Sequence, residues 1–376
     1  MEFKLTEDQI ELKKDLIQFV RNEINGDVHT FKEKWKLCAD YGLFGISFDE
    51  KYGGLGESFI TSALLMEALG YSCDDNGFVF VITNHLWACM NVINQCCYEE
   101  LKQKYLTRLI DGSLIGSLAI TEDESGSDIA SIKTRATKVE NGYLLNGSKA
   151  FISNAPIADV FVVSARTGAP GTMNGISCFV VERNTSGLEI GRDIEKMGLK
   201  SCPMGELNFN DCFIPEENLV GKVGNGLSII NSAMDWERCF EFASNIGVMQ
   251  KLMEMCTTYT EKRKLNQYQA VTHKIAKMRV NIEMSQLLLY KIAWQKDMHK
   301  NTYLEASMFK YFVSETYVQA CLETLQIFGA YGYSIESNIE KEVRDALASK
   351  IYSGASEIQL NIIYKLVDNA IKANLK

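Results

Sequence analysis

The sequence has little proline, little histidine and no excess of positive charge. It contains four residues of each type among 376, and its net charge is −9. Binding to phosphates needs a basic surface, so this charge argues against nucleic acid as a partner. No apolar run reaches the ~20 residues that a helix needs to cross a bilayer, and the charged, amphipathic N terminus is unlike a secretory signal. We therefore expect a cytoplasmic protein without a membrane partner.

The closely spaced cysteine pairs of zinc sites are absent as well. Eleven cysteines are scattered along the chain, and only Cys96 and Cys97 are close neighbours. Zinc ligands usually come in closely spaced pairs, so we predict no metal site. An odd, scattered set of cysteines favours reduced and mostly buried thiols.

Hydrophobic periodicity divides the chain into three parts. Residues 1–112 have helical spacing and open on a capping-box pattern at Thr6 and Gln9. Residues 113–222 alternate like strands, and Asn146-Gly147 predicts a hairpin turn within them.

Residues 223–376 return to helical spacing in four segments, the first a single long helix over 226–264, which suggests a bundle. The prediction is an α+β protein with an N-terminal helical domain, a middle antiparallel β domain and a C-terminal four-helix bundle. A ligand site is expected where the β domain meets the bundle, because sites favour domain junctions.

Five stretches identify a family when they are taken together. They are AITEDESGSDIASIKT (119–134), NGSKAFISNAPIADVFVV (146–163), MGLKSCPMGELNFNDCFIP (197–215), LQIFGAYGY (325–333) and RDALASKIYSGASEIQ (344–359). In this order and spacing they resemble the acyl-CoA dehydrogenase family over essentially the whole chain. The resemblance implies that family's fold, with FAD between the β domain and the bundle. It also implies a homodimer or homotetramer, because the partner's bundle contacts the same FAD.

The first two stretches predict the flavin site. A turn rich in hydroxyls and backbone N–H groups at Thr121 and Ser127 can bind the polar edge of a flavin ring. The family has Pro-Gly-Ala where this chain has Asp123, Glu124 and Ser125, which puts the shape of the loop in doubt. The FAD contacts that the resemblance implies here are Leu118, Ile120, Thr121, Gly126 and Ser127.

Phe151 and Ser153 are expected on one face of a strand, because strand side chains alternate. They stand where the family has a tryptophan that packs on the flavin and a threonine that hydrogen-bonds near its N5 atom. Phenylalanine and serine keep both physical roles. The alternative for Phe151 is an ordinary core aromatic.

Two further segments resemble those that reach the partner subunit's FAD. Gln326 and Gly329 match one of them, although Ala330 replaces a usual glycine. Arg263 and Gln269 match the ends of an Arg-x-x-Phe-Gly-x-Pro stretch from which about five residues are missing. We expect the pyrophosphate and adenine end of FAD to be held differently or more loosely.

The catalytic base is expected at Glu237. Many family members carry their catalytic glutamate where this chain has Ser353, and a serine without an activating partner is no base at neutral pH. A branch that includes isovaleryl-CoA dehydrogenases places the base on the first bundle helix, where this chain reads MDWERCF with Glu237 and Arg238. The alternative is an exposed or salt-bridged helix residue. The substrate contacts implied are Ser127, Arg238, Tyr352 and Ser353.

The resemblance implies an FAD-dependent dehydrogenase of an acyl thioester, with an acyl carrier protein or CoA carrying the substrate and an unknown electron acceptor. Similarity to natural-product enzymes favours a seryl- or glyceryl-type unit on the way to an aminomalonyl or hydroxymalonyl extender unit, as in the colibactin pathway. The alternatives are a prolyl-carrier-protein dehydrogenase, a short-chain acyl-CoA dehydrogenase and a non-catalytic flavin- or carrier-binding homologue. A basic patch for an acidic carrier is expected from Lys251, Lys262, Arg263 and Lys264.

Overall fold

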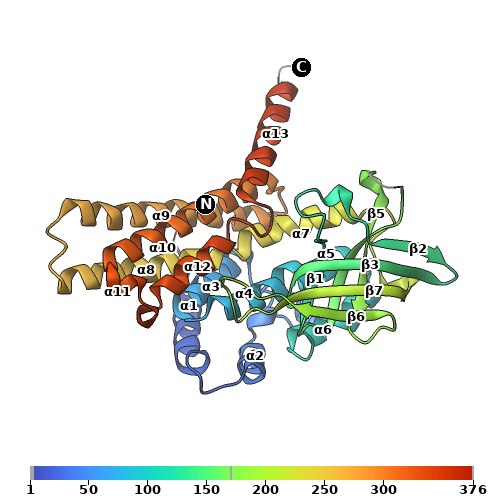
Figure 1. Ribbon diagram of the computed structural model, residues 1–376, viewed down its shortest axis with the longest axis horizontal. Helices are drawn as coiled ribbons and strands as arrows, with labels where there is room; N and C mark the ends of the chain where they lie inside the picture. The colour runs from blue at the N-terminus through green and yellow to red at the C-terminus, as the bar shows by residue number, and fades with distance from the viewer. Residues whose placement is uncertain (1–3, 170–171, 375–376) are drawn as a thin grey trace.

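The computed structural model describes residues 4–169 and 172–374. A helical layer, a β-sheet and a helical bundle follow one another along the chain (Figure 1). This is the α+β order that the sequence predicts. None of the described helices has both the length and the apolar character that a membrane crossing requires.

The N-terminal part is helical, as expected. Its first helix is capped by the predicted box: the Gln9 N–H donates to Thr6 Oγ1 at 3.2 Å, and the Thr6 N–H donates to Gln9 Oε1 at 3.1 Å. The helices of this part are α1 (Glu7–Phe19), α2 (Phe31–Asp40), α3 (Phe59–Ser72), α4 (Asn76–Thr83), α5 (Asn91–Cys96) and α6 (Glu99–Ile110), with the π-helical turns η1 (Val20–Ile24) and η4 (Asn84–Met90).

The middle part is one sheet in the strand order β6-β7-β3-β2-β4-β5-β8, with β1 beside β4. Most neighbouring strands pair antiparallel, as predicted, and the exceptions are β1 and β2, which both pair with β4 in parallel. The strands are β1 (Gly116–Ala119), β2 (Arg135–Val139), β3 (Gly142–Ser153), β4 (Val160–Arg166), β5 (Ile176–Glu182), β6 (Leu188–Asp193), β7 (Met204–Pro215) and β8 (Leu219–Val220).

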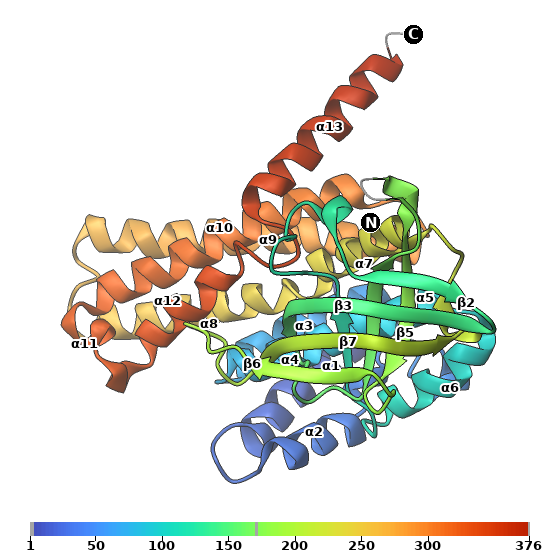
Figure 2. The same cartoon turned by 45° about the vertical axis from the view of Figure 1, so that its right-hand side comes forward.

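Both faces of the central strands are buried. Along β4, Val160 and Val162 join the large core shared with the helices, while Phe161 and Val163 join a second core within the β domain. Alternating side chains therefore serve two cores, which explains why every residue of β4 is buried. In Figure 2, β3, β7 and β6 form the near face and the N-terminal helices lie beneath and behind them.

The predicted hairpin at Asn146-Gly147 is wrong. The turn lies at Asn141, with φ of 58°, between β2 and β3, and β3 runs without a break through residue 147. Gly147 instead marks a shift in register against β7. Its φ is +136°, and a Cβ there would lie 2.7 Å from the Thr134 backbone, so glycine is needed for a close approach of strands rather than for a turn.

The long helix predicted over 226–264 is two helices. α7 (Gly226–Phe240) and α8 (Ala243–Lys262) lie end to end, separated by a two-residue turn at 241–242. α8 packs closely on α3, because a Cβ on Gly247 would lie 1.9 Å from the Glu67 carbonyl oxygen. The turn keeps α7 against the sheet while α8 enters the bundle.

The C-terminal part packs α8, α9 and α10 side by side, with α12 against α10, while α13 contacts α10 and then projects away from the bundle (Figures 1 and 2). The remaining helices are α9 (Gln269–Asp297), α10 (Tyr303–Phe328), α11 (Ala330–Tyr333), α12 (Ile339–Ala348) and α13 (Ser356–Asn374). Single 3₁₀ turns are η2 (Leu43–Gly45), η3 (Glu50–Tyr52), η5 (Ile129–Ser131), η6 (Met173–Gly175), η7 (Glu216–Asn218) and η8 (Ile335–Ser337).

Candidate active site

A buried carboxylate on α7 meets the turn between α12 and α13. The Ser353 hydroxyl donates a 2.8 Å hydrogen bond to Glu237 Oε2, and Arg238 Nε donates a 3.1 Å hydrogen bond to the Ser353 carbonyl oxygen. Two segments 116 residues apart thus converge, as the sequence predicted for Glu237, Arg238 and Ser353. Glu237 is only 5% exposed, so the alternative of an exposed helix residue is wrong, and no salt bridge is formed by it among the described residues.

The surroundings make Glu237 a weak acid. Burial raises its pKa to about 7, against the hydrogen bond from Ser353 and the positive charge of Arg238, which act to lower it. Aromatic rings line this region: Trp87 lies 4.4 Å from Phe240 between ring centroids, and Tyr352 packs at 4.8 Å on Phe242. A carboxyl group with this pKa can accept a proton at neutral pH.

The turn that carries Ser353 is held in a strained shape. Ser353 has φ of 53° and Gly354 has φ of 91°, both in the left-handed region. Gln359 Nε2 donates to the carbonyl oxygens of Ser353 at 3.2 Å and Gly354 at 2.8 Å, which adds to the bond from Arg238. The Ser353 N–H has no hydrogen-bond partner in the described parts of the chain. It is therefore available to a carbonyl oxygen of a ligand.

A buried ion pair fixes α7 beneath the site. Lys296 Nζ on α9 lies 2.6 Å from Asp235 Oδ2, and Thr302 Oγ1 donates to the same oxygen at 2.8 Å. Lys296 also lies over the Trp236 ring, 3.8 Å from its centroid. These contacts set the rotation of α7 and so the direction of Glu237, two residues from Asp235.

The residues predicted to bind flavin lie at the edge of the sheet. The loop that contains Thr121 and Ser127 is tied to β3 by a buried pair, in which Lys149 Nζ lies 2.8 Å from Glu122 Oε1. Burial lowers the pKa of Lys149 to about 8, whereas Lys149 holds the pKa of Glu122 below its usual value although burial acts to raise it. This pair gives the loop a defined shape despite the altered sequence at 123–125.

Phe151 is not an ordinary core aromatic, because 51% of its surface is exposed. Its φ is 58°, and β3 shifts register against β7 between Lys149 and Ile152. Side chains therefore do not alternate regularly between the two faces of β3 at Phe151, so alternation does not justify the prediction that Phe151 and Ser153 share one face. The other predicted residues of this edge are half-buried or exposed: Leu118, Ile120, Thr121, Gly126, Ser127 and Ser153. The side-chain hydroxyls of Thr121 and Ser127 make no hydrogen bond within the described residues.

The second group of predicted FAD residues lies at the far end of the bundle. Arg263 follows α8, Gln269 opens α9, and Gln326 and Gly329 end α10. Figure 1 places these helix ends at the left of the molecule and the sheet at the right. Within one chain, the FAD residues predicted at the edge of the sheet therefore do not meet those predicted at the end of the bundle.

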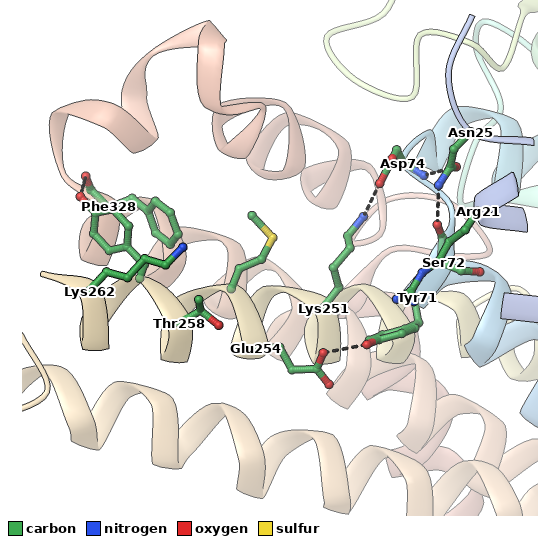
Figure 3. A pocket seen from close by; sticks show the side chains of 12 residues that line it. Arg21, Asn25, Tyr71, Ser72, Asp74, Lys251, Glu254, Thr258, Lys262 and Phe328 are labelled. Atoms are coloured by element: carbon green, nitrogen blue, oxygen red, sulfur yellow. Dashed lines mark hydrogen bonds and ion pairs between the residues drawn. The ribbon is translucent and has the colours of Figure 1, made fainter. Parts of the chain in front are cut away.

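A hollow of about 550 Å³ lies between the α1–α3 end and α8, away from Glu237 (Figure 3). Its polar groups are largely paired with one another: Tyr71 donates to Glu254 at 2.7 Å, and Lys251 lies 3.9 Å from Asp74. The hollow contains none of the residues of the α7 site. Lys251 and Lys262, two of the four residues of the expected basic patch, both line this hollow, and Lys251 Nζ lies 3.6 Å from Glu342 Oε1.

Sequence reasoning missed three polar side chains next to Glu237. Glu241, Asn245 and Lys310 are buried, and each has a polar atom without a hydrogen-bond partner among the described residues. Glu241 stands four residues after Glu237, a spacing that places both on one helix face and could have indicated it. Lys310 comes from α10 and carried no sequence signal.

Three sequence profiles match the chain, and together they cover most of it. They describe the N-terminal domain (residues 6–113), the middle domain (117–212) and the C-terminal domain (224–367) of acyl-CoA dehydrogenases. The chain belongs to the acyl-CoA dehydrogenase family. It is therefore a member of a family of flavoprotein oxidoreductases acting on CH–CH bonds, and the predicted fold class is confirmed.

Similar proteins act on carrier-bound prolyl groups. The L-prolyl-[peptidyl-carrier protein] dehydrogenase of Pseudomonas fluorescens (strain Pf-5) is 37% identical over 336 residues, 88% of each chain. The crystal structure of the prolyl acyl carrier protein oxidase AnaB has a TM-score of 0.95 and 37% identity, over 97% of this chain and all of that one. The FAD complex of PigA has a TM-score of 0.94 and 34% identity, over 98% and 99%. These relatives favour the prolyl alternative over the extender-unit interpretation.

Proposed function

We propose that this protein is an FAD-dependent dehydrogenase of an aminoacyl unit held as a thioester on a carrier protein, with Glu237 as the base. The observation that carries the proposal is the buried Glu237 beside Ser353, whose N–H has no hydrogen-bond acceptor among the described residues. A prolyl unit is the first candidate, because relatives that cover nearly the whole chain are named for it.

The residues present fit an FAD. At the sheet edge, an exposed Phe151 ring offers a surface for a flat ring system, and the Thr121, Ser127 and Ser153 hydroxyls are available as hydrogen-bond donors. Gly126 leaves open space, since a Cβ there would meet nothing within 4 Å. Bound FAD supplies the acceptor for the hydride that leaves the substrate β carbon.

The chain's own residues handle the proton and the thioester. The α hydrogen of a thioester is only weakly acidic, so the base must be strong enough to remove it and dry enough to be selective. Glu237 meets both needs through burial. The Ser353 N–H can donate to the thioester carbonyl oxygen and stabilise the negative charge that develops there as the α proton leaves.

Arg238 and Gln359 act by positioning. Both donate to the Ser353 carbonyl oxygen, so they hold the peptide that presents the Ser353 N–H. Neither needs to contact the substrate. Removal of Gln359 would misdirect this N–H without changing the base, whereas removal of Arg238 would also raise the pKa of Glu237, which the positive charge of Arg238 acts to lower.

We also propose that the active form is at least a dimer. The sheet that carries Phe151 and the Gln326 end of α10 lie apart in one chain, with the sheet at the right of Figure 1 and the end of α10 at the left, and the family resemblance assigns both to FAD contacts. A neighbouring subunit that places its Gln326 end against the Phe151 edge would complete the site. The shortened stretch after Arg263 would then leave the adenine end of FAD less tightly held.

An anaerobic flavin-bleaching assay tests the function. The holoenzyme is mixed with prolyl, seryl and glyceryl carrier thioesters and with the matching CoA thioesters. We expect rapid bleaching by an aminoacyl carrier thioester, prolyl first, and much slower bleaching by CoA forms. Bleaching by butyryl-CoA alone would favour a catabolic dehydrogenase, and no bleaching by any thioester would contradict an enzymatic role.

A further inference from the structure

Glu241 is a buried carboxyl group that the protein itself leaves unpaired. It is 2% exposed, and neither carboxyl oxygen has a hydrogen-bond partner among the described residues. A buried polar group without a partner costs free energy, and native proteins keep few of them. Such a group therefore points to a ligand that satisfies it.

The position of Glu241 relates it directly to the base. The Glu241 N–H donates to the Glu237 carbonyl oxygen at 3.1 Å, so the two residues lie one helical turn apart at the end of α7. Side chains four residues apart on a helix are neighbours, with Cβ atoms roughly 5–6 Å apart. This spacing allows a substrate carbon whose hydrogen points at Glu237 to present a second substituent to Glu241.

The neighbourhood of Glu241 is polar in an otherwise aromatic wall. Lys310 from α10 is fully buried, and its Nζ also lacks a hydrogen-bond partner in the described chain, lying 5.5 Å from the centroid of the Phe242 ring. Asn245 Nδ2 is unpartnered and borders a small cavity shared with Tyr352. Glu241, Lys310 and Asn245 would make no favourable polar contact with an acyl group that is only a hydrocarbon chain.

The charges act on one another. Burial, then the negative charge of Glu237, raises the pKa of Glu241 well above its usual value, while Lys310 acts to lower it. Burial and the charge of Arg238 lower the pKa of Lys310 to about 7. No salt bridge joins Glu241 and Lys310 among the described residues, so each keeps its hydrogen-bonding capacity for a third group.

We propose that Glu241 is a specificity-determining residue that binds the α-amino group of the acyl unit, one helical turn from Glu237. This rests on the proposed function and narrows its substrate class to aminoacyl thioesters. A bound ammonium group would bring the positive charge that stabilises ionised Glu241. Lys310 would compete for the same carboxylate, so its positive charge would weaken amine binding rather than support it.

The test compares paired substrates that differ only in the amine. Prolyl and cyclopentanecarbonyl units on the same carrier have similar ring sizes, and seryl and 3-hydroxypropionyl units form a second pair. The readout is the apparent dissociation constant for each thioester in anaerobic flavin reduction. For the wild type, we expect a preference for the amine of roughly 10- to 100-fold, as for a hydrogen bond to a charged group.

Glu241→Leu should remove this preference, and the nearly isosteric Glu241→Gln should reduce it if the leucine variant folds poorly. Lys310→Met should keep or increase it. Ser307→Ala, which changes another buried and unpartnered group on α10, is the control and should leave the preference unchanged. Glu241→Leu should also raise the melting temperature by about 1–3 °C without substrate, because it removes an unpaired buried carboxyl group.

The outcomes separate the two proposals. If the wild type is bleached by aminoacyl thioesters and both Glu241 variants keep the full preference for the amine, Glu241 has only a structural role and this inference is overturned. If no aminoacyl thioester bleaches the wild type, the proposed function itself fails. An equal loss of the preference in Glu241→Leu and Lys310→Met would also contradict the inference, since Lys310→Met should keep or increase it.

Discussion

Removal of the Ser353 hydroxyl should shift the pH at which the enzyme becomes active. In the structure this hydroxyl donates a 2.8 Å hydrogen bond to Glu237 Oε2. A donor stabilises the ionised carboxylate and so lowers its pKa. Ser353→Ala keeps the backbone N–H but removes this donor, so the pKa of Glu237, about 7 in the intact protein, should rise further.

The magnitude follows from one hydrogen bond to a charged group. Such a bond is worth roughly 1.5–3 kcal/mol, and 1.36 kcal/mol corresponds to one pKa unit. The pKa of Glu237 should therefore rise by about one to two units. Since the base must be ionised to accept the α proton, flavin reduction at pH 7 should slow by roughly 5- to 50-fold. The loss should diminish as the pH rises past the new pKa.

The assay is the second-order rate constant of anaerobic flavin reduction at low substrate, measured from pH 6 to pH 10, because it reports the free enzyme. Ser356→Ala is a matched control: at the start of α13, just after this turn, the Ser356 hydroxyl donates a 2.8 Å hydrogen bond to a different carboxylate, Glu315. That variant should leave the profile in place. If the pKa on the acid side of the Ser353→Ala pH–rate profile equals or lies below that of the wild type, the reasoning about this hydrogen bond is refuted.

Three further outcomes are expected. Glu237→Gln should be more stable than the wild type by roughly 2–3 kcal/mol at pH 8 but by less than about 1 kcal/mol at pH 5, because a carboxyl group whose pKa is raised by folding costs stability only above its unfolded pKa. If the variant and the wild type have equal melting temperatures at both pH values, this would count against a buried, ionisable Glu237. Lys149→Met should destabilise the protein by about 3–5 kcal/mol and release FAD, since it leaves the Glu122 carboxylate buried without its counter-charge. An unchanged melting temperature in calorimetry and an unchanged FAD content would argue that the Lys149–Glu122 pair does not hold the loop. When inactive Phe151→Ala and Gln326→Ala proteins are mixed and their subunits exchange, FAD binding should return in up to roughly a quarter of the sites, because one of the two sites in each mixed dimer has both residues intact. No recovery after exchange would contradict a site built from two subunits.

The sequence predicted the elements whose signals are local. The capping box at Thr6, the strand period of residues 113–222 and the helical period of the C-terminal part all depend on neighbouring residues, and all appear in the structure. The meeting of Glu237 and Ser353 could also be anticipated. It rested on the family resemblance, in which a carboxylate lost at one position is matched by a carboxylate gained at another.

The errors arose where long-range packing overrides local preference. Asn146-Gly147 is a strong turn signal, but pairing with β7 keeps β3 extended there, and the turn forms at Asn141 instead. The break between α7 and α8 falls at Glu241 and Phe242, where neither proline nor glycine marks it, so no local pattern reveals it. Lys310 could not be foreseen for the same reason, because only the tertiary fold brings α10 against the end of α7.

Single-turnover flavin reduction by Glu237→Gln tests the central claim most directly. The amide is nearly isosteric and cannot accept the α proton, so FAD content and thioester binding should stay close to those of the wild type. The rate of flavin reduction by the prolyl carrier thioester should fall by ~10²–10⁴-fold. Adding Ser353→Glu to this variant should restore part of the rate, since the two positions converge on one carbon. A wild-type rate in Glu237→Gln would contradict the assignment of the base.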